Sequence, residues 1–143
     1  MDIRIAFLGG KRVDAVFGDH VVTTDQSVAH GGSGAAPEPF DMFLASVGTC
    51  AGAYVLGFCQ ARGIPSEGIE LIQHNRFDEA SHRLERVELE LRLPATFPEK
   101  YRDAILRAAE GCKVKKALAS PPEIAVRSEV VAANGSPTVA ESL

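Results

Sequence analysis

Apolar and polar residues alternate in short runs through the first 23 positions of the chain. Residues 3–7 and 13–17 are rich in strand-forming residues, and turn signals at Gly9-Gly10 and Gly18-Asp19 separate them. This pattern predicts a meander of short antiparallel strands. The segment 24–37 then changes to Ser, Gly and Ala, with a glycine-rich centre at 31–34. Its composition predicts a loop long enough to act as a lid or spacer.

The longest apolar stretch predicts a helix over residues 39–62. Pro39 suits the first helical position, Asp41 suits the positively polarised first turn, and Gly63 suits the end. No charged residue occurs between Asp41 and Arg62, so the stretch is long enough for a membrane span. Small and polar residues interrupt it and no basic residue flanks its start, which favours a helix buried on all sides by protein. A second copy of the chain can supply part of that cover.

The following segments predict a strand pair and then a helix pair. Clean alternation over 86–93 indicates a half-buried strand that partners another strand at 69–73. The residues at 96–99 combine a threonine N-cap, an early proline and a glutamate, which is typical of a capping box at a helix start. This helix ends near Gly111, and 112–118 predicts a second short helix.

Apolar residues at 124, 126 and 130 predict a closing strand. The order of elements is three strands, a long helix, two strands, a helix pair and one strand, which is typical of the α+β class. At 143 residues, with 45% hydrophobic and 24% charged residues, the chain has material for one core. We therefore predict a single domain over 1–133 and a flexible tail at 134–143.

The charge, the cysteines and the histidines indicate which partners, compartment and metals to expect. A net charge of −4 provides no polybasic surface, so nucleic acid and anionic membrane are disfavoured as partners. Three cysteines do not make a disulfide framework, and no secretory leader pattern opens the sequence, so we expect a cytoplasmic protein with free thiols. The four histidines show no ligand spacing with the cysteines, which disfavours a metal site.

The cysteines are the candidate reactive residues of the sequence. Cys50 and Cys59 lie half a turn out of phase on one helix and cannot bond each other, so the candidate pair is Cys50 with Cys112. Local charge favours Cys112 as the more acidic thiol, because it precedes a helix that carries Lys113 and two further lysines. Apolar surroundings predict a raised pKa for Cys50 unless a cation reaches it. The alternative is that these cysteines only fill the core.

Two segments, 39–50 and 112–118, resemble the two cysteine motifs of the OsmC/Ohr family. The resemblance implies an obligate dimer with a swapped α+β fold, in which antiparallel sheets surround long buried helices at the centre. It also implies an antioxidant, stress-response function, because the better-known members are thiol-dependent hydroperoxide peroxidases. By this resemblance Cys50 is the peroxidatic cysteine and Cys112 the resolving one.

The same family uses an arginine to hold the thiolate and a carboxylate to hold that arginine. Lys11 occupies the usual arginine column, and we favour the adjacent Arg12 because a guanidinium can hold a thiolate and a carboxylate in one plane. Asp41 is the candidate carboxylate, with Glu38 as a second possibility. Lys113 stands where proline is usual, so the chain resembles a less characterised branch. The alternatives are a helix-capping role for Asp41 and a solvated turn for the basic pair.

The leading hypothesis is a homodimeric peroxidase that reduces organic hydroperoxides and is restored by an external dithiol. Apolar residues near Cys50 favour an organic peroxide; they are Met42, Phe43, Val47 and Tyr54. No metal, haem or flavin is required by this chemistry. The rival hypothesis is a non-catalytic or small-molecule-binding dimer with structural cysteines, and a third hypothesis makes Cys112 the nucleophile.

Overall fold

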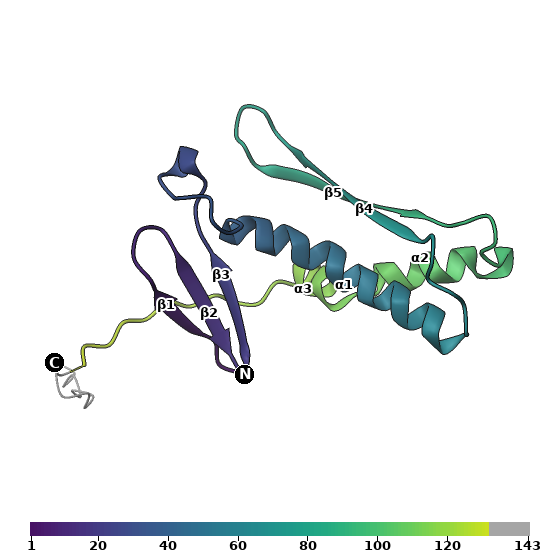
Figure 1. The fold of residues 1–143 in the computed structure, drawn as a ribbon, viewed down its shortest axis with the longest axis horizontal. Helices are drawn as coiled ribbons and strands as arrows, with labels where there is room; N and C mark the ends of the chain where they lie inside the picture. Colours follow the sequence, from purple (N-terminus) through teal and green to yellow (C-terminus); the bar gives the residue numbers. More distant parts are fainter. Residues whose placement is uncertain (132–143) are drawn as a thin grey trace.

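The computed structural model describes residues 1–131, as a long helix with a small sheet near its start and a hairpin along its side (Figure 1). The predicted tail at 134–143, and the predicted domain end at 133, lie outside these residues. In chain order the elements are β1 (Arg4–Phe7), β2 (Val13–Phe17), β3 (His20–Thr24), the 3₁₀ helix η1 (Val28–His30), α1 (Pro39–Ala61), β4 (Glu70–Phe77), β5 (Leu84–Arg92), the 3₁₀ helix η2 (Glu99–Tyr101), α2 (Arg102–Glu110) and α3 (Lys113–Ala119).

The predicted N-terminal meander is confirmed. β1, β2 and β3 pair antiparallel in sequence order, and Val13 of β2 lies opposite Phe7 on one side and Thr24 on the other. The sheet lies beyond the first turn of α1, away from the β4–β5 hairpin (Figure 1). Neither outer strand of this sheet pairs with another described strand, and Phe7 and Val21 are exposed.

The predicted long helix is confirmed as α1. Pro39 is its first residue, Asp41 lies in its first turn, and Gly63 follows its end with a φ of +61° that suits glycine. By length and composition alone α1 could cross a membrane. One face of it is buried in the protein core instead, through residues spaced at three and four positions: Leu44, Val47, Ala51, Val55, Phe58 and Cys59.

The core forms where α1 packs against α2, α3 and β4. Its members include Phe58 and Ala51 of α1, Ile105 of α2 and Phe97 before η2. The β4–β5 hairpin runs along one side of α1, and its odd-numbered residues from Leu89 to Leu93 pack on this cluster, as the alternation predicted (Figure 1). The class is α+β, with a three-stranded and a two-stranded antiparallel sheet.

Burial of α1 on all sides, which the sequence predicted, is not reached within one chain. Phe40, Phe43 and Leu56 of α1 remain exposed because α2, α3 and β4 leave part of the helix surface uncovered. A helix with so little charge normally buries the whole of its surface. An apolar surface of α1 is therefore exposed in the single chain, although the sequence pattern predicts that protein covers it.

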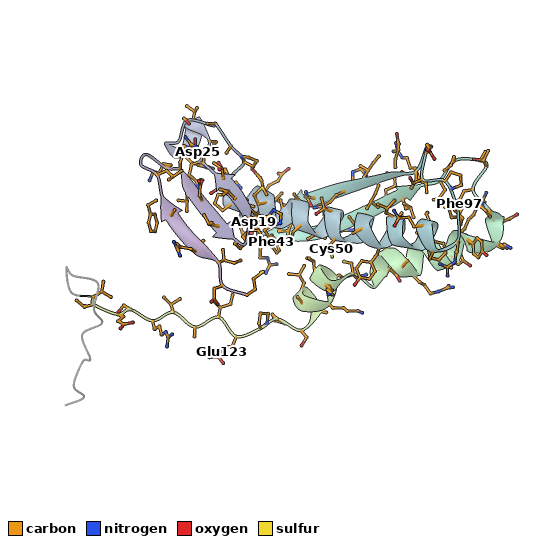
Figure 2. All side chains as sticks on the ribbon, turned by 60° about the horizontal axis from the view of Figure 1, so that its bottom comes forward. Asp19, Asp25, Phe43, Cys50, Phe97 and Glu123 are labelled. Atoms are coloured by element: carbon orange, nitrogen blue, oxygen red, sulfur yellow. The ribbon has the colours of Figure 1, made fainter. Side chains whose placement is uncertain are left out.

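The predicted closing strand at 124–130 is not formed in the single chain. Residues 121–130 run as an extended segment away from α3, with Glu123 near its start (Figure 2). Ile124 is 86% exposed and Val126 is 94% exposed. The physical reason is that no strand among residues 1–131 pairs with this segment, and a strand needs a neighbour to accept and donate its ladder hydrogen bonds.

The predicted capping box at 96–99 is wrong. The chain there forms a turn in which the Phe97 N–H donates to Pro94 O, and η2 then begins at Glu99 with Pro98 as its N-cap. Phe97 is buried in the core, and Pro98 has no N–H for the Thr96 hydroxyl to cap. The helix itself follows as α2, from Arg102 to Glu110, and the second short helix follows as α3.

Candidate functional site

Cys50 and Cys112 lie together. Cys50 is about midway along α1 and half-buried, and Cys112 is the buried N-cap residue of α3 (Figure 2). The Cys112 thiol is close enough to Cys50 to help lower the pKa of the Cys50 thiol. Both side chains pack on the same core cluster, and neither is in a disulfide. The structure therefore brings together the pair that the sequence selected.

The first turn of α3 lies next to these two sulfur atoms. The Lys115 N–H donates to Cys112 Sγ at 3.5 Å, and that of Lys116 donates to Cys112 O at 3.2 Å. The N–H groups of Val114 and Lys113 are close enough to Cys50 to influence its thiol. The first N–H groups of a helix have no intrahelical partner, so the Cys112 thiol supplies an acceptor that this helix start requires.

These contacts lower the pKa of the Cys50 thiol below its ordinary value. The Val114 N–H contributes most, followed by the Cys112 thiol, the Lys113 N–H and the Lys113 ammonium, and together they outweigh the opposing effect of burial. A raised pKa was expected for Cys50 unless a cation reached it; the pKa is lowered, and the Lys113 ammonium is a cation among the causes, although the Val114 N–H contributes more. The sequence signal was the helix start after Cys112, but the sequence did not reveal that this start faces the thiol of α1.

Cys59 is a different kind of thiol. It is fully buried in the core cluster, and desolvation raises its pKa, with partial opposition from the positive charge of Arg62. Arg62 itself stacks on the Phe58 ring at 3.7 Å and donates to Phe58 O. A buried thiol with a raised pKa is unreactive, so Cys59 fills core volume.

Lys11 and Arg12, the predicted cations of the site, do not lie at Cys50 in the single chain. Lys11 and Arg12 occupy the turn between β1 and β2, where the Arg12 N–H donates to Gly9 O. The Lys11 side chain lies near Gly31, since its Cε is 3.9 Å from where a Cβ would be on that glycine. Neither residue is among the leading influences on Cys50, where the one charged group is Lys113.

The predicted carboxylates stabilise the start of α1. Asp41 Oδ2 accepts from the Glu38 N–H at 3.2 Å, in agreement with the capping alternative for this residue. Glu38 Oε1 accepts from the Ser27 N–H at 2.9 Å and lies 2.8 Å from His30 Nδ1, and hydrogen bonds from Ser27 and His30 lower the pKa of Glu38 to about 2. Asp41 precedes Cys50 by nine residues, or about 13 Å of helix, so it does not touch the thiol.

The glycine-rich loop is held by a second carboxylate that the sequence analysis did not single out. Asp25 is buried, and it accepts hydrogen bonds from Gln26 N–H, Ala35 N–H and both the N–H and hydroxyl of Ser33. The Ser33 hydroxyl contributes most to lowering the pKa of Asp25 to about 2. Gly32 packs so closely on Gln26 O that a Cβ there would lie 2.0 Å from that oxygen. The only sequence signal was an aspartate followed by a Ser/Gly-rich loop.

An open hollow of about 780 Å³ lies between α1, the β4–β5 hairpin, α2 and α3, and neither Cys50 nor Cys112 lines it. Apolar residues of α1, β4, β5, α2 and α3 line it, among them Phe43, Val47, Leu71, Leu89, Leu106 and Leu118. Val47 lies three residues before Cys50 on α1, and Lys115 reaches the hollow from α3. Of the residues expected around Cys50, Phe43 and Val47 line this hollow, and Tyr54 lines a separate shallow groove with Phe58.

No metal-binding group is found in the described part of the chain. Among residues 1–131, no three side chains of His, Cys, Asp or Glu come close enough together to hold a metal ion.

Similarity to known proteins shows which family the chain belongs to. No curated protein sequence matches it. A solved structure from Psychrobacter arcticus 273-4, of a protein named for osmotic stress induction and a detoxification response, is similar with a TM-score of 0.68 at 19% identity, over 80% of this chain and 85% of that one. An organic hydroperoxide resistance protein, OsmC, from Legionella pneumophila is similar with a TM-score of 0.51 at 17% identity, over 82% and 89%. The family model for OsmC-like proteins matches residues 31–127, which include both cysteine motifs, and the chain therefore belongs to the OsmC-like protein family.

Proposed function

We propose that this protein is a homodimeric, cysteine-based peroxidase that reduces organic hydroperoxides in the cytoplasm. The observation that carries the proposal is the pairing of the Cys50 thiol, whose pKa is lowered by the start of α3, with the Cys112 thiol next to it. Thiolate is the reactive form of cysteine, and an adjacent second thiol is what resolves its oxidised product.

The first step is attack by the Cys50 thiolate on the distal oxygen of the hydroperoxide. A sulfur–oxygen bond forms, the oxygen–oxygen bond breaks, and the leaving alkoxide takes up a proton to become an alcohol. Cys50 becomes a sulfenic acid. The N–H groups of Lys113 and Val114 favour this step because they stabilise the sulfur as an anion before attack.

The second step joins the two cysteines. Cys112 sulfur attacks the Cys50 sulfenic sulfur, a disulfide forms, and the hydroxyl leaves with the Cys112 proton as water. An external dithiol then reduces this disulfide by two exchange reactions and is itself oxidised to a disulfide. Each electron pair moves between sulfur and oxygen or between sulfur atoms, so the cycle requires no metal, haem or flavin.

An apolar wall near α1 favours an organic peroxide over a small hydrophilic one. The hollow that Phe43 and Val47 of α1 help to line has leucine, valine and phenylalanine side chains on its walls, together with charged side chains of β4, β5, α2 and α3. Apolar walls lower the free energy of an alkyl or aryl group that leaves water. The organic hydroperoxide resistance named for the Legionella relative agrees with this substrate class.

Uncovered apolar surface supports the dimer. Ile124 and Val126 of the C-terminal segment and Phe7 of the N-terminal sheet are almost fully exposed, and Phe40 of α1 is about half exposed. Among residues 1–131, the outer strands of both sheets have no further strand beside them. A two-stranded sheet such as β4–β5 has only marginal stability by itself. Arg12 and Asp41 stay candidate members of the site on the resemblance alone, and in a dimer the Arg12 that acts on Cys50 would come from the second copy.

The hollow also supports the rival function, a dimer that binds a small apolar molecule without chemistry at Cys50. The two functions differ in what they require of the thiol. The rival predicts that Cys50 resists iodoacetamide until the protein unfolds. The peroxidase predicts rapid modification of Cys50 at neutral pH in the folded protein.

The test is turnover of cumene hydroperoxide with dithiothreitol by wild type, Cys50→Ser, Cys112→Ser and, as a matched control, Cys59→Ala. We expect Cys50→Ser to lose about 10³-fold or more in rate, as removal of a nucleophile does. Cys112→Ser should consume one equivalent of peroxide rapidly and form a sulfenic acid, and Cys59→Ala should turn over as wild type does. If all four proteins are equally inert, or all equally active, the proposed function is wrong.

A further inference from the structure

We infer that Asp25 is a positioning residue of the proposed site, which holds the β1–β2 turn and its two cations, Lys11 and Arg12, in a fixed place through the loop at 25–38. The inference rests on the proposed function, in which this turn of the second copy brings a cation to the Cys50 thiol. It gives a task to the one buried charged side chain among residues 1–131, which the peroxidase steps themselves do not use.

The end of the N-terminal sheet places Asp25 beside Arg12. In the antiparallel pairing of β2 with β3, Val13 lies opposite Thr24, and the Thr24 hydroxyl donates to Val13 O at 2.8 Å. Arg12 precedes Val13 and Asp25 follows Thr24, so the same register sets these two residues opposite each other, one position beyond the last pair. The β1–β2 turn and the loop after β3 accordingly lie at the same end of the sheet (Figure 1).

The Asp25 carboxylate fixes the path of the loop with both of its oxygens. Oδ1 accepts from the Gln26 N–H at 2.8 Å, and Oδ2 accepts from the N–H groups of Ser33 and Ala35 at 3.2 Å and from the Ser33 hydroxyl. The Asp25 N–H donates to Pro37 O at 3.1 Å, which ties the end of the loop to its beginning. Loss of these acceptors would leave several donors unpaired, so this carboxylate keeps the loop rigid.

The loop held by Asp25 contacts the turn that carries the cations. Lys11 Cε lies 3.9 Å from where a Cβ would be on Gly31, and the φ of +82° at Gly31 suits glycine. The same loop is tied to the start of α1, because Glu38 Oε1 accepts from the Ser27 N–H at 2.9 Å. The loop therefore connects the turn to α1 as a rigid spacer.

The two cations of the turn have no acidic partner in the described part of the chain. None of the ion pairs among residues 1–131 includes Lys11 or Arg12. Asp25 thus acts on the turn through the backbone and the loop, and leaves both positive charges free for a second copy.

Four changes separate positioning from general stability. Asp25→Asn replaces one carboxylate oxygen by an amide nitrogen that cannot accept hydrogen bonds. Ser33→Ala is a milder variant, which removes one donor and retains the carboxylate. Asp78→Asn is the matched control, because Asp78, between β4 and β5, also accepts from a serine N–H and hydroxyl, those of Ser81. The double variant Lys11→Met/Arg12→Leu removes both cations and provides the background in which Asp25→Asn is repeated.

Amide hydrogen exchange of the full chain at pH 7 measures the position of the turn directly. The reporters are the Leu8 and Arg12 N–H groups, which donate across the turn to Arg12 O and Gly9 O. We expect Asp25→Asn to accelerate their exchange roughly tenfold, because the loop no longer holds the turn. Asp78→Asn should leave both rates as in wild type. Unchanged exchange at Leu8 and Arg12 in Asp25→Asn would overturn the inference.

The rate at which iodoacetamide modifies Cys50 at pH 7 measures the consequence for the thiol. Asp25→Asn and the double variant should each react roughly three- to tenfold more slowly than wild type, the effect of one cation lost from beside a thiolate. In the double-variant background Asp25→Asn should cause no further slowing, because no cation is left to position. The rates of all variants should converge at pH 10, where the thiol is ionised in each of them.

Slowing of the same size with and without the two cations would overturn the inference, because Asp25 would then act on the fold in general. So would a wild-type rate in Asp25→Asn or in the double variant. Light scattering and circular dichroism establish that the variants keep the wild-type assembly and fold, and if Asp25→Asn does not, Ser33→Ala decides by the same criteria. Neither assay contains peroxide, so a wild type without peroxide turnover would reject the proposed function while these rates still decide the role of Asp25.

Discussion

The Val114 N–H, at the start of α3, makes the largest contribution to lowering the pKa of the Cys50 thiol on α1, although the two residues belong to different helices and to distant parts of the chain. Along the chain, Cys112 is the thiol next to this helix start, and its sulfur accepts a hydrogen bond from the Lys115 N–H at 3.5 Å. The start of α3 therefore acts on both sulfur atoms. Under the proposed function, Cys50 is the nucleophile and Cys112 is its neighbour.

The lowered pKa of Cys50 predicts a pH profile for peroxide reduction. The second-order rate constant with cumene hydroperoxide should rise with pH as the thiol ionises and reach half of its maximum below pH 9.0, the ordinary pKa of cysteine, because the pKa of Cys50 is lowered. It should fall as pH decreases through the pKa of Cys50, because the thiol form does not attack. Stopped-flow measurement between pH 5 and 10 tests this. A rate that still climbs steeply above pH 9 would mean that the folded protein does not stabilise the thiolate.

Acid is expected to loosen the loop between β3 and α1. Hydrogen bonds lower the pKa values of Asp25 and Glu38 to about 2 from ordinary values of 3.8 and 4.5. A depressed pKa means that the ionised carboxylates stabilise the folded loop above pH 4.5, and this stabilisation is lost as pH falls toward 2. Amide hydrogen exchange at Ser33 and Ala35 should accelerate over this range, and Asp25→Asn should show the acceleration already at neutral pH. Protection that is equal in Asp25→Asn and wild type at pH 7 would contradict this role.

Two adjacent residues of α2 should differ sharply in their effect on stability. Ile105 is fully buried in the core cluster, whereas Leu106 is 47% exposed beside the hollow. Ile105→Ala removes a buried side chain and leaves a cavity, which costs about 2–5 kcal/mol of the free energy of unfolding. Leu106→Ala, the matched control, should cost less than half as much. Urea denaturation of both variants measures the difference in the free energy of unfolding. Equal losses of this free energy would mean that Ile105 is not the core residue of α2.

The C-terminal segment is expected to mediate association. If a second copy covers the apolar side chains at Ile124 and Val126, wild type should be a dimer by light scattering, and Val126→Asp should weaken it because an aspartate would be buried without a partner. Ala125→Asp is the control, since its side chain lies on the opposite side of an extended strand. A wild type that is a monomer would contradict this arrangement. So would a dimer that Val126→Asp and Ala125→Asp weaken equally.

The sequence predicted the elements whose signals are local. The helix from Pro39 to Ala61 has a proline at its start, a glycine after its end and no charge in between, and the meander from Arg4 to Thr24 has strands separated by glycine turns. The cysteine pair was also predictable, because helix periodicity excluded Cys50 with Cys59 and left Cys112. Each of these inferences needs only the chemistry of neighbouring positions.

What the sequence could not predict depends on partners distant along the chain. The closing strand at 124–130 had the correct alternation but pairs with no strand among residues 1–131. Thr96 had the correct spacing for a cap, but Phe97 is buried in the core. The lowered pKa of Cys50 depends on α3 beginning next to it, where Val114 packs on the core cluster. In each place a tertiary contact, or the lack of one, decided the outcome against the local pattern.

Disulfide mapping after a single addition of peroxide tests the central claim most directly. Reduced wild-type protein is treated with one equivalent of cumene hydroperoxide, free thiols are blocked, and the tryptic peptides are identified by mass spectrometry. The account predicts one crosslink, between the Cys50 and Cys112 peptides, with Cys59 blocked as a free thiol. A protein in which Cys50 remains a free thiol while the peroxide persists, or in which Cys50 is oxidised without a link to Cys112, would contradict it.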